Sequence, residues 1–262
     1  MISKSEAELA KFLQENIEIG KHVFVIAGFS GIGKTHTVER VANTNEFIFL
    51  QIDSNVADLK EVIHTNLEDS EGTYLVCIEN LDLGVLGTQQ TLLKTIEEYA
   101  ANVYWVITCH NLKYLQETII SRSLVFNMLP PTSEELIKFA QELNSSAYEI
   151  IRKAVVWKAV QSFADVNLVL YLFNQDKSKF DYLNELFPIK YTDSISNISY
   201  RIQHYPDKSK IPLDFLFKLI IANSRNVNVQ YEAIKHLADL ERLNSYAVVN
   251  HFLFSVKYLA QN

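Results

Sequence analysis

The sequence predicts an α/β protein: a five-stranded parallel sheet with helices on both faces, followed by a part built only of helices. Up to residue 129, short apolar runs alternate with helical runs, a pattern typical of a parallel sheet buried on both faces. All seven glycines lie at or before Gly87, and all five prolines lie at or after Pro130. Beyond Pro131, every run has a helical pattern.

The expected elements follow in order along the chain. Strands are expected at residues 22–28, 46–53, 73–80, 103–109 and 124–129, with helical runs at 35–44, 55–68, 88–100 and 112–120. Pro130-Pro131 predicts a domain boundary, because proline disfavours helix at its own position and at the one before it. Beyond it, we expect a small unit of helices at 132–143, 146–160 and 164–176, a polar linker at 174–179 and a second helical unit. The expected domains are residues 1–130, 131–175 and 176–262.

Composition and charge limit the class of protein. The chain has 262 residues, is 48% hydrophobic and carries a net charge of −7, as is ordinary for a globular protein. Residues 1–129 hold nine Lys and Arg against 17 Asp and Glu, whereas residues 130–262 hold 15 against 14. A protein that binds nucleic acid by itself usually has a basic face, which this balance does not indicate. With no long apolar segment and no signal peptide, we expect a cytoplasmic protein without membrane contact.

Cysteine and histidine usage gives no indication of a metal site. Cys77 and Cys109 each lie in a strand-like apolar run, which favours two reduced, buried thiols over a disulfide or a metal centre. The seven histidines are scattered without the spacing of metal ligands.

The stretch IAGFSGIGKTHTVERVA (residues 26–42) predicts a phosphate-binding loop. Residues 28–35, GFSGIGKT, fit G-x-x-x-x-G-K-[ST] between an expected strand and an expected helix. Such a loop wraps a phosphate with backbone N–H groups, and the following helix adds its positive end. Lys34 supplies a charge to the outer phosphates, and the Thr35 hydroxyl is a ligand for Mg²⁺. The expected ATP-binding residues are Gly28, Ser30, Gly31, Ile32, Gly33, Lys34, Thr35 and His36.

A phosphate-loop ATPase also needs an acid at the end of a neighbouring strand, which holds Mg²⁺. The run YLVCIENLD places Glu79 there, followed by Asn80, and the alternative for Glu79 is an acid that only faces solvent. Many such ATPases have Asp followed by Glu, and the Glu polarises the attacking water. An amide accepts no proton, so the pattern predicts ATP binding with slow hydrolysis, and Asp82 is the nearest other acid.

Residues 88–135 contain short motifs that resemble a known family. The segment TLLKTIEEYAANVYWVITCHNLKYLQETIISRSLVFNMLPPTSEE is similar to the central region of clamp-loader ATPases, the AAA+ subunits that load sliding clamps onto DNA, of the DNA polymerase III and replication factor C type. The run KHVFVIAGFSGIGKT resembles their phosphate-loop segment. The resemblance covers residues ~20 to ~145 and implies a P-loop domain, a three-helix lid and an all-helical collar through which subunits form a ring.

The resemblance also implies roles for single residues. Arg122 of IISRS matches the arginine finger, which reaches the ATP of a neighbouring subunit; its alternative role is to bind the carbonyl end of its own helix. His110 matches the residue that senses the γ-phosphate, with Thr108 and Asn111 as alternatives one or two positions away. The phosphate-sensing arginine of the lid is replaced by Asn167.

The resemblance implies a subunit that binds ATP and Mg²⁺ and acts with ring partners, a sliding clamp and primer-template DNA. The sequence departs from the family pattern at four points. Phe29 stands in place of proline, Glu79-Asn80 in place of Asp-Glu and Ser123 in place of cysteine, and the four-cysteine zinc module is missing. These departures and the short chain suit a compact version of the family. The alternatives are another AAA+ replication ATPase, such as a helicase loader or initiator, and a nucleotide-stabilised scaffold without turnover.

Overall fold

The computed structural model describes residues 2–67, 72–84, 87–99, 102–175, 177–186, 213–224 and 227–239. The chain divides into two compact units, Met1–Thr132 and Ser133–Asn262. This division falls beside Pro130-Pro131, where the sequence predicts the first boundary. A further division of the helical part into a lid and a collar stays a prediction.

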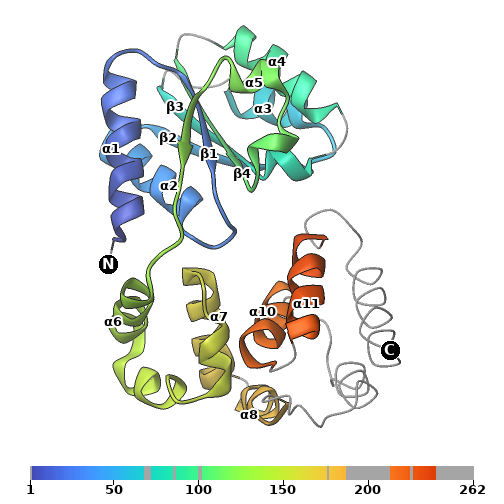
Figure 1. The fold of residues 1–262 in the computed structure, drawn as a ribbon. Helices are drawn as coiled ribbons and strands as arrows, with labels where there is room; N and C mark the ends of the chain where they lie inside the picture. Colours follow the sequence, from blue (N-terminus) through green and yellow to red (C-terminus); the bar gives the residue numbers. More distant parts are fainter. Residues whose placement is uncertain are drawn as a thin grey trace. The chain divides into compact units, whose positions relative to one another are not determined.

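The N-terminal unit alternates strands and helices (Figure 1). Its elements are α1 (Lys4–Glu18), β1 (Val23–Ala27), α2 (Lys34–Thr44), β2 (Ile48–Asp53), α3 (Leu59–Leu67), β3 (Tyr74–Glu79), η1 (Leu81–Leu83), α4 (Thr88–Glu98), β4 (Val103–Cys109), η2 (Leu112–Tyr114), α5 (Glu117–Ile120) and β5 (Leu124–Asn127). All five predicted strands are present, and every pairing between them is parallel.

The order of strands in the sheet is β2-β3-β4-β1-β5. Strand β1, which leads into the phosphate loop, is therefore not adjacent to β3, which ends in Glu79, because β4 lies between them. Ala27 of β1 pairs with Cys109 of β4, and Ile78 of β3 pairs with Ile107 of β4. The carboxyl ends of these three strands meet at one edge of the sheet, where ligands of open α/β sheets bind.

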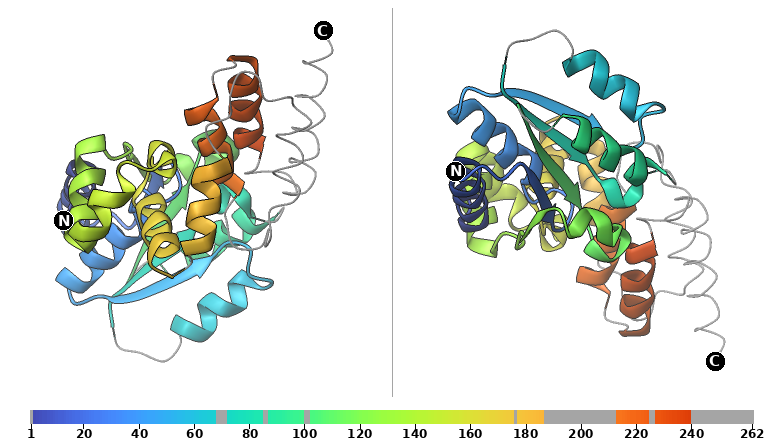
Figure 2. Two further views of the ribbon diagram at one scale, coloured as in Figure 1. Left: turned by 90° about the horizontal axis from the view of Figure 1, so that it is seen from below. Right: turned by 90° about the horizontal axis from the view of Figure 1, so that it is seen from above.

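Helices cover both faces of the sheet, as the sequence predicts. Helices α1 and α2 lie on one face, and α3 and α4 lie on the other (Figures 1 and 2). Along β4, Trp105 and Ile107 join the core under α3 and α4, whereas Val106 joins the core under α1 and α2. This alternation explains why the strand is apolar throughout, since both faces of the sheet are buried.

Helix α1 is not among the elements expected from the sequence. Ser3 and Glu6 form a capping box at its start, and Leu9, Leu13 and Ile17 form its buried stripe. Both are recognisable signals in the sequence, because a serine followed three residues later by glutamate commonly begins a helix.

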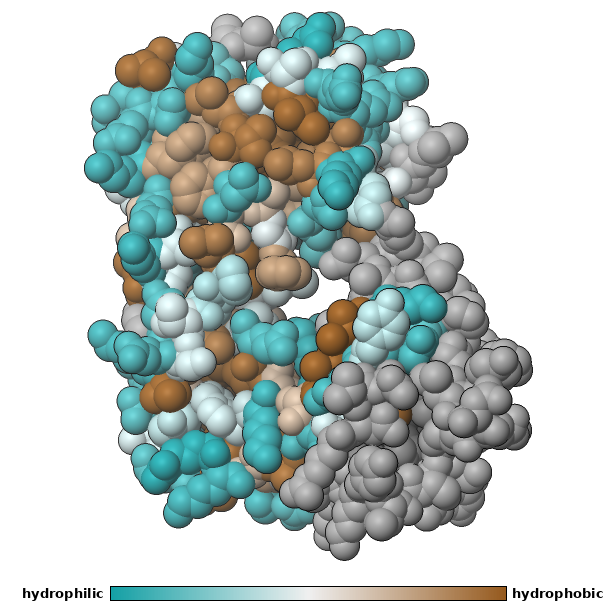
Figure 3. Space-filling view, viewed as in Figure 1, coloured by the Kyte–Doolittle hydropathy of each residue, from teal (hydrophilic) through white to brown (hydrophobic). Residues whose placement is uncertain are grey.

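Strand β5 forms the other edge of the sheet. Its Leu124, Val125 and Phe126 are only partly buried, and hydrophobic residues gather on the middle of the face of the N-terminal unit in Figure 3. At the end of this strand, the backbone N–H of Leu129 donates to Ser5 Oγ at 3.0 Å, so the chain leaving the sheet is tied to the first turn of α1.

The helical unit contains α6 (Ser133–Ile151), η3 (Val155–Ala159), α7 (Phe163–Gln175), α8 (Lys177–Leu186), α10 (Leu213–Asn223) and α11 (Val227–Asp239). A non-helical residue, Asn144 (φ −160°, ψ 92°), breaks α6 between the two segments that the sequence treats as separate helices. Residues 187–212 and 240–262, part of the expected collar, lie outside the described residues.

Three predicted elements are wrong in extent. The helix expected at 146–160 ends at Ile151, and η3 forms its second half. The expected helix 112–120 is two short elements, η2 and α5. The linker expected at 174–179 lies mostly within helices, because α7 runs to Gln175 and α8 begins at Lys177.

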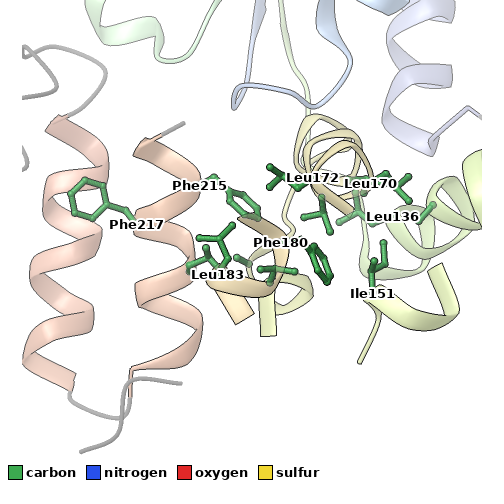
Figure 4. Close-up of a cluster of buried hydrophobic side chains, with 14 of the residues drawn as sticks. Leu136, Ile151, Leu170, Leu172, Phe180, Leu183, Phe215 and Phe217 are labelled. Atoms are coloured by element: carbon green, nitrogen blue, oxygen red, sulfur yellow. The ribbon is translucent and has the colours of Figure 1, made fainter. Parts of the chain in front are cut away.

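One hydrophobic core joins the helices of this unit. The labelled residues of Figure 4 come from α6, α7, α8 and α10, and they include Leu136, Leu170, Phe180 and Phe215. Lys218 of α10 also binds both carboxylate oxygens of the buried Asp165 of α7, at 2.9 and 3.0 Å.

No helix among the described residues has the length and apolar character needed to cross a bilayer.

Candidate nucleotide site

The phosphate loop begins at the carboxyl end of β1 and is anchored to β4. The Gly28 N–H donates to the Cys109 carbonyl at 3.1 Å. A Cβ at Gly28 would lie 2.8 Å from the Met128 carbonyl oxygen, so a side chain would require the backbone to move. Gly33 has φ 101°, a left-handed conformation that favours glycine, and a Cβ there would lie 2.7 Å from Glu6 Oε1. The glycines at these two positions are therefore required by space and by backbone conformation.

Lys34 begins α2 and turns back into the loop. Its Nζ donates to the carbonyls of Gly28 at 2.6 Å and of Phe29 at 2.8 Å. The residue is 7% exposed. The loop of residues 28–35 therefore encloses the buried Lys34 ammonium. The positive charge that the sequence predicts for the outer phosphates lies inside this loop.

Thr35 and Glu79 lie in direct contact, although 44 positions separate them in the chain. The Thr35 hydroxyl donates to Glu79 Oε1, and Gln51 Nε2 donates to Glu79 Oε2 at 2.8 Å. A hydroxyl and a carboxylate oxygen are ligands that Mg²⁺ prefers, so this pair fits the predicted metal position. Gln51 is not among the residues predicted from the sequence, where its only signal is a polar side chain within the expected strand FIFLQID.

Asn80 has an unusual backbone conformation, with φ 53° and ψ 44°. Its N–H donates to Thr108 Oγ1 at 3.1 Å, and its carbonyl accepts from Ser54 Oγ at 2.9 Å. Asparagine adopts this left-handed region more readily than glutamate does. The left-handed backbone therefore gives a physical reason for asparagine at residue 80, where members of the clamp-loader family have glutamate.

Asp82 is fully engaged in holding the residues that follow β4. Its Oδ2 accepts from the backbone N–H groups of His110 at 2.9 Å and Asn111 at 3.1 Å, and its Oδ1 lies 3.4 Å from His110 Nδ1. Burial by itself raises the pKa of Asp82, but the hydrogen bonds from the His110 side chain and backbone and from Asn111 hold that pKa below its usual value. With its side chain 0% exposed, Asp82 is badly placed to take a proton from water directly.

The other predicted residues of the loop differ in exposure. Ile32 is buried in the core under α1 and α2, whereas Ser30 is exposed. His36 is exposed, and its Nδ1 lies 3.3 Å from Glu6 Oε1, which connects the start of α2 to the first turn of α1. Glu6 is 4% exposed, and its position against the loop is not among the features predicted from the sequence.

Arg122 lies just after α5 with its side chain half exposed. Its Nη1 donates to the Thr118 carbonyl at 3.2 Å, and its Nε lies 3.6 Å from Glu97 Oε1. The guanidinium thus binds a carbonyl of its own helix, as in the alternative role, and an exposed acid. Neither partner buries it, so it remains accessible from solvent. Asn167, the residue at the lid position, is also exposed, on α7 of the helical unit.

The two cysteines are buried and unpaired. Burial raises the pKa of the Cys109 thiol to about 12, helped by the nearby Asp82 carboxylate, and burial also raises the pKa of Cys77 far above its usual value. Within the described residues, no group of three or more His, Cys, Asp and Glu side chains could hold a metal.

These shifts predict very slow thiol labelling in the folded protein. At pH 8 both side chains remain protonated and inaccessible, and the thiolate is the reactive form. We expect no labelling by a chromogenic disulfide reagent within an hour, and two labelled thiols after unfolding in guanidinium. Rapid labelling of either cysteine in the native protein would contradict the buried placement.

No family model and no curated protein sequence matches this chain. Among solved structures, the chain is similar to a point mutant of Thermotoga maritima RuvB, with 14% identity and a TM-score of 0.50. The match covers 82% of this chain and 89% of that chain. RuvB is an AAA+ P-loop ATPase. This chain has the AAA+ fold. The sheet order β2-β3-β4-β1-β5 agrees with that assignment.

Proposed function

We propose that this protein is an ATP-binding subunit of a clamp loader, which helps to place a sliding clamp on primer-template DNA. The observation that carries nucleotide binding is the contact between Thr35 and Glu79 beside a glycine loop that encloses the Lys34 ammonium. These groups come from the ends of separate elements, and their convergence matches what a nucleotide with Mg²⁺ requires. We infer a cytoplasmic protein that works in a homo- or hetero-oligomeric ring.

The clamp-loader role is supported by the sequence motifs between residues 88 and 135 and by the order of an AAA+ domain followed by helices. Another AAA+ replication ATPase is the second candidate. An initiator usually carries its own basic DNA-reading module, whereas the 11 Lys and Arg of residues 176–262 are spread along the segment. A scaffold without turnover is the third candidate, and the amide at Asn80 is the observation that favours it.

Native mass spectrometry of the full chain, with and without Mg-ATP, tests this proposal. We expect ATP to promote assemblies of several subunits, alone or with partner subunits. Duplex DNA should bind weakly to the single chain, because the chain carries a net negative charge of −7. A chain that stays monomeric with ATP and binds duplex DNA tightly by itself would contradict the proposal and favour an initiator.

Arg122→Ala should leave ATP binding to the isolated chain unchanged and lower hydrolysis by the assembled complex at least tenfold. The reason is that the guanidinium is accessible and would stabilise charge on the ATP of a neighbouring subunit. Fluorescent ATP binding and phosphate release measure the two effects, with the exposed Arg152→Ala as the matched control. Loss of binding in the isolated chain would show that Arg122 serves its own site.

A further inference from the structure

We propose that His110 accepts the proton of the attacking water during ATP hydrolysis and that Asp82 is its positioning residue. The proposal deepens the proposed function and rests on the ATPase part of it. It starts from an unusual juxtaposition: the carboxylate of Asp82, whose side chain has no exposed surface, lies against an imidazole at the edge of the sheet where β1, β3 and β4 end. The position at which the resembled family has a catalytic carboxylate holds Asn80.

His110 lies where a proton acceptor for the attacking water would be needed, at the carboxyl end of the sheet. It follows β4, the strand between the loop strand β1 and the acid strand β3. On one side, the carbonyl of the preceding Cys109 accepts from Gly28, the first residue of the phosphate loop. On the other side, Thr108 Oγ1 accepts from the N–H of Asn80, which follows Glu79. His110 is therefore attached to both halves of the site through its own strand.

Asp82 decides which nitrogen of His110 carries the proton. The pKa of Asp82 is below its usual value, so near neutral pH the side chain is a carboxylate and only accepts hydrogen bonds. In the neutral imidazole, His110 Nδ1, at 3.4 Å from Oδ1, then carries the hydrogen, and the lone pair is on Nε2. Nε2 has no hydrogen bond to any described residue, and the side chain is 9% exposed. It is available to a molecule that enters the site.

The other candidates for a base are already engaged. Glu79 binds Thr35 and Gln51 through its two oxygens. Asp82 is buried and accepts three hydrogen bonds, two of them from backbone N–H groups. Asn80 has no basic group at all. Of the side chains at this edge that are described, His110 alone combines a free lone pair with a partner that stabilises its protonated form.

The step balances without any further reactant. The water oxygen forms a bond to the γ-phosphorus, and the bond between that phosphorus and the bridging oxygen breaks, so that ADP leaves with the electron pair. One water proton moves to His110 Nε2. The resulting imidazolium is stabilised by the Asp82 carboxylate until the proton passes to solvent, and phosphate is then released.

The decisive variant is His110→Asn. An asparagine still donates a hydrogen bond to a phosphate but accepts no proton, so it separates contact with ATP from proton transfer. With the full chain at saturating Mg-ATP, we expect single-turnover phosphate release about 100-fold slower and ATP affinity within about threefold of wild type. The control His64→Asn, on α3, should leave both unchanged, and thermal unfolding should confirm that each variant is folded. Retention of turnover in His110→Asn would overturn the proposal.

Asp82→Asn tests whether Asp82 positions the proton of His110. The measured signal is the tautomer of His110, which a merely structural role of Asp82 would not change. Two backbone N–H groups face one oxygen of residue 82, so an amide must place its carbonyl there and turn its NH₂ toward His110. The imidazole proton should then move from Nδ1 to Nε2, with a loss of turnover similar to that of His110→Asn. Nitrogen-15 NMR of histidine-labelled protein distinguishes the two tautomers. The same tautomer in both proteins would overturn the proposal.

The outcomes also separate this inference from the proposed function. A wild-type chain that fails to bind ATP contradicts the proposed function itself. A wild-type chain that binds ATP but releases no phosphate overturns the role of His110 and leaves nucleotide binding intact. Failure to bind a sliding clamp contradicts only the clamp-loader assignment.

Discussion

Lys34→Ala should weaken ATP binding about 100-fold, which corresponds to about 2.7 kcal/mol. The Lys34 ammonium is the cation enclosed by the loop, and it is held there by the carbonyls of Gly28 and Phe29. On binding, it would exchange these neutral acceptors for phosphate oxygens, and hydrogen bonds between charged groups are about twice as strong as neutral ones. Equilibrium titration with a fluorescent ATP analogue measures the loss.

Lys21→Ala is the matched control, because Lys21 is an exposed lysine just before β1 and lies outside the loop. It should bind the analogue like wild type. Circular dichroism and thermal unfolding of Lys34→Ala should show a folded protein. If a folded Lys34→Ala variant kept its affinity, residues 28–35 would not be a phosphate loop, and the proposed function would fail with it.

Glu79→Gln should remove the dependence of hydrolysis on Mg²⁺ and slow phosphate release by about 100-fold, or about 2.7 kcal/mol of transition-state stabilisation. The amide keeps an oxygen that accepts from the Thr35 hydroxyl, so the local fold should persist. It lacks the negative charge with which a carboxylate holds a hard divalent cation. ATP affinity in the presence of a chelator should therefore stay close to wild type, while the gain in affinity on adding Mg²⁺ should disappear.

Asp53→Asn provides the control for Glu79→Gln. Asp53 pairs in register with Glu79 at the end of the neighbouring strand β2 and is exposed, so its change removes the same charge from the same edge. We expect full Mg²⁺ dependence in this variant. Equal losses in both variants would indicate a general effect of charge at the edge and would remove Glu79 from the metal site.

The sequence by itself determined the parallel five-stranded class and the start of the helical part near Pro130-Pro131. It also predicts where the phosphate loop lies. These features depend on local patterns. A strand buried on both faces has to be apolar throughout, and the sharp loop needs glycine at Gly28 and Gly33 because a Cβ would collide or the backbone is left-handed. The resemblance to clamp loaders added roles for Arg122 and His110 that remain predictions.

The tertiary structure decided what local patterns do not encode. Strand order places β4 between β1 and β3, so His110 at the end of β4 lies between the ends of those two strands, and Asp82 contacts it although 28 positions separate the two residues. Residue spacing along the chain could not predict that contact, nor the contact of Gln51 with Glu79. The left-handed backbone at Asn80 likewise depends on hydrogen bonds to Thr108 and Ser54 from other segments. Side chains from separate strands meet at the edge of the sheet only after the strands have paired. The contacts between them can therefore be identified only in the folded chain.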